Sequence, residues 1–129
     1  MKTVERMRNE FLVFLESEFP KVVMVKPLMK GGKDRTSPKM PGERRWMQVD
    51  VNSNSLSIVI NYKTGTINEV DLQKVGIPIG LSGDRTAWKI GPNNDNLSLS
   101  IFPGQPIEFD QEHFVELLKK LYRGYLALL

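Results

Sequence analysis

The stretch RRWMQVDVNSNSLSIVINY, residues 44–62, decides the fold class. Apolar residues alternate with polar ones in both of its halves, which is the two-residue period of a strand with one buried face. Between the halves, the residues NSNS favour a turn. The stretch therefore predicts two neighbouring antiparallel strands, and its parity predicts these buried side chains: Met47, Val49, Val51, Leu56, Ile58 and Ile60.

The same parity assigns a second set of side chains to the opposite face of the predicted sheet. This face is polar and carries one or two aromatic residues, so it is either an ordinary solvated face or a contact surface. The contact interpretation requires Trp46 to be exposed, because an exposed indole can stack on a base or enter a protein interface. The candidate contact residues on this face are Trp46, Gln48, Asp50 and Asn61.

Amphipathic helices are predicted at both ends of the chain. Thr3 can cap the first helix, whose apolar residues recur at three- and four-residue spacing until Phe19-Pro20 ends it. Asp110 is the predicted N-cap of the last helix, with Phe109 packed on Phe114 as a hydrophobic staple. The apolar stripe of that helix comprises Phe114, Leu117, Leu118, Leu121, Tyr125 and Leu128.

Shorter elements complete the prediction. Strands are expected at 21–25, 86–90 and 97–102, and 66–70 is a further candidate, while residues 68–83 fit either a short helix or a loop. An antiparallel sheet with one apolar face must be covered on that face, and the two terminal helices are available to cover it. We therefore predict a single α+β domain over residues 1–129, with an antiparallel sheet of about five to six strands and both terminal helices on one face.

Positive charge is concentrated in residues 26–45, KPLMKGGKDRTSPKMPGERR. This segment has a net charge of +5 within a chain whose net charge is +3. Residues 26–43 are predicted to form a long basic loop, and unstructured connections beyond about 12–15 residues are usually functional or disordered. The segment is either a solvated loop or an anion-binding arm, and the candidate anion- or nucleic-acid-binding residues are Lys26, Lys30, Lys33, Arg35, Lys39, Arg44 and Arg45.

The sequence disfavours several kinds of catalytic site. Gly31-Gly32-Lys33 does not fit a phosphate-binding loop, because Pro27 and Asp34 occupy positions that the motif reserves for Gly and for Ser or Thr. The chain has no cysteine and a single histidine, His113, so neither a thiolate site nor a histidine ligand set is expected. A metal-dependent nuclease is a less favoured alternative, and its only candidate residues are Asp50, Glu69, Asp71 and Lys74. We expect no enzyme activity, no catalytic residue, no metal and no cofactor.

The expected function is therefore that of a small binding module whose partner is nucleic acid. A protein–protein interaction module, such as an inhibitor, immunity or adaptor protein, is the alternative. It is suggested by the apolar residues Leu126, Leu128 and Leu129, which dock on the domain itself or form a homodimer through the C-terminal helix. The absence of cysteine and of any long apolar run favours a cytoplasmic protein without membrane contact.

Overall fold

The computed structural model describes residues 2–42, 44–63, 65–75, 87–89, 94–104 and 107–127. Its helices are α1 (Val4–Glu18), α2 (Glu69–Val75) and α3 (Glu112–Leu126), with a short 3-10 turn η1 (Lys30–Gly32). Its strands are β1 (Val23–Val25), β2 (Asp34–Met40), β3 (Arg44–Arg45), β4 (Met47–Val51), β5 (Leu56–Lys63), β6 (Ala87–Lys89) and β7 (Asn94–Ile101).

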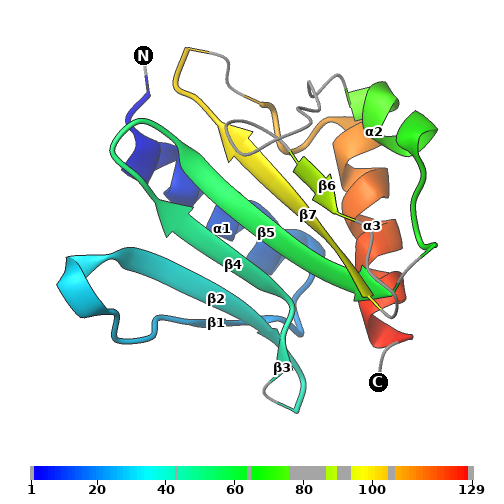
Figure 1. Cartoon of the computed structure of the whole chain (residues 1–129), viewed down its shortest axis with the longest axis horizontal. Helices are drawn as coiled ribbons and strands as arrows, with labels where there is room; N and C mark the ends of the chain where they lie inside the picture. The colour runs from blue at the N-terminus through cyan, green and yellow to red at the C-terminus, as the bar shows by residue number, and fades with distance from the viewer. Residues whose placement is uncertain are drawn as a thin grey trace.

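The strands form one antiparallel sheet in the order β1-β2-β4-β5-β7-β6, with β3 pairing β2 next to β4 (Figure 1). Because only Trp46 separates β3 from β4, the two are parts of one strand, and six strands lie side by side. The predicted α+β class and antiparallel sheet are confirmed.

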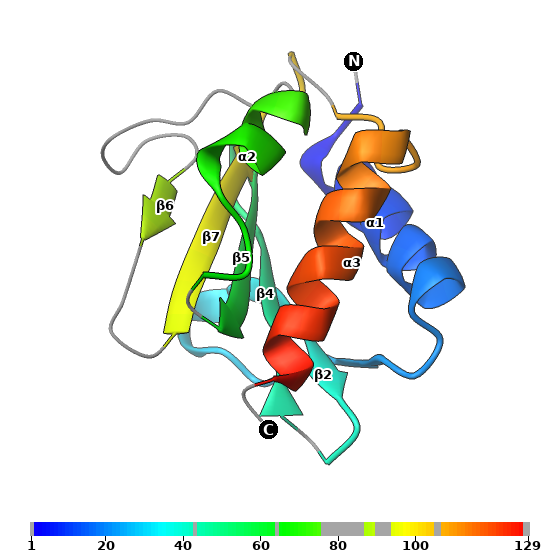
Figure 2. The ribbon, with the colours of Figure 1, turned by 90° about the vertical axis from the view of Figure 1, so that its right-hand side faces the viewer.

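Both long helices lie on the same side of the sheet (Figure 2). They cover the apolar face that parity predicted, and every predicted residue of that face is buried except Val51, which is half-buried. Phe11 and Leu15 of α1 and Phe114, Leu118 and Leu121 of α3 are completely shielded from solvent in the same core. In the part of the chain that the structure describes, the other face of the sheet carries no helix, and we call it the open face.

The ends of the two long helices agree only partly with the prediction. The Thr3 side chain accepts a hydrogen bond from the Arg6 backbone N–H and so caps α1, which ends before Phe19 as predicted. The predicted N-cap Asp110 is wrong by one residue, because α3 begins at Glu112 and its N-cap is Gln111. The predicted contact between Phe109 and Phe114 is present, with ring centroids 5.7 Å apart.

The predicted basic loop at 26–43 is wrong in its second half, because this part of the chain is β2, a strand paired on both sides. Its sequence, DRTSPKM, lacks apolar alternation and contains a proline, so it does not resemble a strand.

The short helix among the alternatives for 68–83 is confirmed as α2, while residues 76–86 lie outside the described part of the chain. β1 is confirmed as a strand, but it lies at the sheet edge with Val23 58% exposed.

A β-bulge at Trp46 explains both the proline in β2 and an error in the predicted faces. Lys39 pairs with Arg45 and Thr36 with Val49, so the strand opposite β2 holds one extra residue. The Trp46 N–H donates to the Pro38 carbonyl at 2.9 Å, and the bulge accommodates the missing N–H of Pro38. As a result, the side chains of Trp46 and Met47 are both fully buried, although they are consecutive.

Candidate anion-binding groove

A groove of about 410 Å³ runs over the open face where β1, β2 and β3 meet. One wall is apolar and comes from alternate residues of the chain that leaves β1, namely Val25, Pro27 and Met29. The remaining lining residues are Arg35, Ser37 and Lys39 of β2 and Arg45 of β3. The groove therefore combines an apolar wall with three basic side chains.

The strand register explains why these residues lie together. Val25 pairs with Ser37 and Lys39 pairs with Arg45, and residues directly opposite each other in an antiparallel pair point to the same face. Arg35 likewise pairs with Asp50 of β4. The alternation along β2 thus brings Arg35, Ser37 and Lys39 to the open face, where Ser37 is nevertheless buried, while Thr36 and Met40 are buried on the side of the core.

Arg35 is held in a fixed position by Asp50. Its Nε donates to Oδ1 at 2.7 Å and its Nη2 to Oδ2 at 2.9 Å, which is a bidentate guanidinium–carboxylate pair. Lys33 adds a second ion pair, with its Nζ 3.2 Å from Asp50 Oδ2. Burial alone would raise the pKa of Asp50, but the hydrogen bonds from Arg35 and Lys33 outweigh it and hold the pKa below its usual value.

Lys39 and Arg45 have no such partner. Neither cation lies within 4 Å of a carboxylate in the part of the chain that the structure describes. They face each other directly across β2 and β3, and like charges in this position repel and destabilise the strand pair. An anion bound between them would remove that repulsion.

The other predicted basic residues divide into two groups. Lys26 is 3.3 Å from Asp34, which also accepts a hydrogen bond of 2.6 Å from Arg8, and Lys33 is bound to Asp50 as described above. Lys30 and Arg44 are exposed and form no ion pair within the described ranges. The prediction therefore named three residues of the groove, Arg35, Lys39 and Arg45, together with four that lie outside its lining.

The predicted contact residues of the sheet face require one clear correction. Trp46 is not exposed, since the bulge turns its ring into the core against Phe19 and Tyr122, with centroids 5.2 and 5.3 Å away. Asp50 is buried and paired, while Gln48 and Asn61 are half-buried. The Asn61 amide donates to the Trp46 carbonyl at 3.4 Å, so it supports the bulge.

Sequence reasoning missed four lining residues: Val25, Pro27, Met29 and Ser37. A signal was present, because Val23, Val25, Pro27 and Met29 recur at the period of an extended chain. This pattern was overlooked because residues 26–43 were interpreted as a loop.

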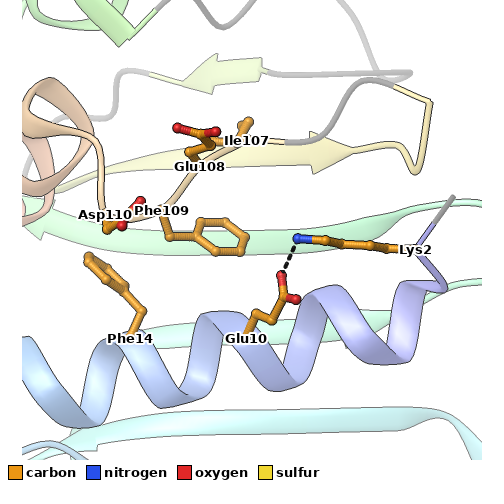
Figure 3. Close-up of a pocket in the computed structure, with 7 residues that line it drawn as sticks. All are labelled: Lys2, Glu10, Phe14, Ile107, Glu108, Phe109 and Asp110. Atoms are coloured by element: carbon orange, nitrogen blue, oxygen red, sulfur yellow. Dashed lines mark hydrogen bonds and ion pairs between the residues drawn. The ribbon is translucent and has the colours of Figure 1, made fainter.

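A second pocket, of about 440 Å³, lies between α1 and the segment that precedes α3 (Figure 3). Its apolar lining includes the rings of Phe14 and Phe109, whose centroids are 6.3 Å apart. Lys2 donates to Glu10 at 2.8 Å across this pocket, and Glu108 and Asp110 are also among its lining residues. Three carboxylates and one lysine give it a net negative charge, so it would repel the anion that the basic groove favours.

The candidate residues for metal chemistry do not form a common site. Asp50 is paired on the open face, whereas Asp71 accepts a hydrogen bond of 2.8 Å from Lys120 and so joins α2 to α3. In the described ranges, no three His, Asp or Glu side chains are grouped so that they could hold a metal ion. His113 is exposed on α3, 3.7 Å from Glu116.

Comparison of the chain with protein-family models, with curated proteins and with solved structures finds no match. Within the residues described, no helix has the length and apolar character needed to cross a membrane.

Proposed function

We propose that this protein is a non-enzymatic binding module that holds the phosphate groups of a nucleic acid in the basic groove of its open face. The observation that supports the proposal is the cross-strand pair of Lys39 and Arg45, two cations in register that no described carboxylate neutralises. A phosphate between them satisfies both charges, and the Arg45 guanidinium can contact two of its oxygens.

A polyanion fits this surface better than a single small anion. Lys30 follows the groove residue Met29 in the chain. It is an exposed cation without an ion pair among the described residues. A nucleic acid carries phosphates at regular intervals and can engage this outlying cation together with the groove.

The experiment is a titration of a labelled oligonucleotide at several salt concentrations. Each phosphate contact contributes about 0.7 to the slope of log K against log salt for a single strand and about 0.9 for a duplex. The double variant K39A/R45A should therefore bind more weakly and lose about 1.4 to 1.8 of that slope.

The matched control is K119A/R123A, which removes the same charge from α3, on the other side of the sheet. It should bind nearly as the unmodified protein does. Binding that is absent at low salt, independent of salt, or weakened equally by both double variants would refute the proposal.

A protein partner is the second candidate function. The observation in its favour is Leu126, which is 42% exposed in the last turn of α3, while Leu128 and Leu129 lie outside the described residues. Light scattering after size-exclusion chromatography tests the homodimer, and a monomer at high concentration would exclude it. A partner that remains bound after nuclease treatment would favour the adaptor interpretation over the nucleic-acid one.

A further inference from the structure

We infer that the groove accepts a single strand of nucleic acid, with a base packed against Arg35 and Met29 and a phosphate held by Lys39 and Arg45. This inference rests on the proposed function and specifies its ligand. It follows from three features of the groove: an immobilised guanidinium, an apolar wall, and a small number of free cations.

The guanidinium of Arg35 is already neutralised. Its two hydrogen bonds to Asp50 occupy one edge of the group, and its side chain is only 16% exposed. It is therefore a poor phosphate ligand. A fixed, planar guanidinium that lines a groove can instead stack on a base, which is a common mode of recognition of unpaired bases.

The apolar wall has no role in a site that contacts only phosphate. Val25, Pro27 and Met29 line the groove on the side of the β1 edge, and the Met29 sulfur lies 3.9 Å from Arg35 Nη1. A methionine thioether is polarisable and adapts well to the faces of aromatic rings. Met29 and Arg35 thus form a continuous surface that suits a flat nucleobase, next to the cations that suit its phosphate.

The number of free cations also favours a single strand over a duplex. Lys26, Lys33 and Arg35 are bound to Asp34 or Asp50, which leaves only Lys39 and Arg45 unpaired in the lining of the groove. Proteins that bind duplex DNA through its backbone typically make about 6–10 phosphate contacts. In a duplex the bases are also stacked inside the helix, where Met29 and Arg35 could not contact their faces.

The test compares three ligands that carry the same number of phosphates: a single-stranded oligonucleotide, an abasic strand and a duplex. We expect the single strand to bind about tenfold or more tightly than the abasic strand, because stacking of each base contributes substantially to binding in such sites. We expect the duplex to bind more weakly than the single strand as well.

A pair of neighbouring substitutions tests the contact with the base directly. Met29→Trp adds an aromatic face inside the groove and should tighten binding of the single strand while leaving the abasic strand unchanged. Leu28→Trp is the matched control, because Leu28 is fully exposed and does not line the groove. It should change neither affinity. Thermal unfolding of both variants verifies that each is folded.

The outcomes separate the inference from the proposed function. If the three ligands bind equally and Met29→Trp behaves as Leu28→Trp does, the groove contacts phosphate alone, so the inference is wrong and the proposed function stands. If an oligoglutamate peptide of equal charge competes as well as the single strand does, the site is a general acidic-ligand site and both fail. If none of the three nucleic acids binds at low salt, both fail too.

Discussion

Gly124 lies in α3 against the turn that follows β5, and a Cβ built on it would stand 2.9 Å from the Cβ of Thr66 and closer still to the other Thr66 side-chain atoms. The Thr66 hydroxyl donates to the Lys63 carbonyl, so this turn is braced and does not yield easily. The glycine therefore allows α3 to pack closely against the end of β5.

Gly124→Ala should destabilise the protein although it raises helix propensity. At an open position in a helix, Gly→Ala stabilises by about 1 kcal/mol, whereas overpacking costs about 1–3 kcal/mol. We expect the overpacking to dominate and to lower the free energy of unfolding, measured with urea. Gly104→Ala is the control, since nothing lies within 4 Å of its added Cβ. A Gly124→Ala variant as stable as the unmodified protein would contradict the close contact.

At the scale of elements, two clusters of ion pairs hold β2 in place, one around Asp34 and one around Asp50. Arg8 and Lys26 bind Asp34, and Lys33 and Arg35 bind Asp50. Burial alone would raise the pKa of Asp34, but the hydrogen bonds and charges of Arg8 and Lys26 outweigh it and hold the pKa below its usual value. The pKa values of Asp34 and Asp50 are therefore both lowered, and both carboxylates stabilise the folded state in their ionised form.

This arrangement predicts a loss of stability in acid. A carboxyl whose pKa is lower in the folded state stabilises the protein above its unfolded pKa of about 3.9, and this stability is lost as the pH falls through the folded pKa. The free energy of unfolding should therefore change little between about pH 5 and 7 and decline below about pH 4. Asp50→Asn should reduce that decline and also lower stability at pH 7, since it leaves Arg35 unpaired. Asp110→Asn, on the exposed turn before α3, is the control, and an equal effect of both substitutions would contradict the role of the cluster.

The elements that the sequence predicted well are those with a strong apolar period. α1, β4, β5 and β7 each bury one regular stripe, so the α+β class and the core face followed directly. β2 was missed because its polar residues and Pro38 fit a loop, and it is a strand only through pairing with β1 and β4. The position of Trp46 was missed because a bulge inverts parity, and no local signal in RRWM marks the extra residue.

At the scale of the whole molecule, the number of Lys and Arg residues predicted which segment is basic, but it did not predict which of these cations lack an ion pair. Within residues 26–45, the pairing of three of the seven cations with Asp34 or Asp50 depends on strand register, which the sequence did not provide. The two cations left in the groove oppose each other, so their arrangement costs stability that the fold does not require. Such a loss of stability is expected where two cations are kept together to bind an anion. It can be measured as a change in the free energy of unfolding.

Arg45→Glu should make the protein more stable and abolish the proposed binding of nucleic acid. The substitution replaces a repulsive cross-strand pair with an attractive one opposite Lys39, which should add about 0.2–1 kcal/mol to the free energy of unfolding. The same change places a negative charge in the groove, so a phosphate is repelled. Urea unfolding and oligonucleotide titration measure the two effects on the same sample.

The control for this prediction is the neighbouring residue. Arg44→Glu makes the same change in charge, but Arg44 pairs with Met40 and faces no cation across the strands, so it should bring no comparable gain in stability and a smaller loss of binding. If only Arg45→Glu raises stability while it weakens binding, the pair of Lys39 and Arg45 is a ligand-binding site. If Arg44→Glu and Arg45→Glu behave alike, the cations of β3 serve only as general surface charge.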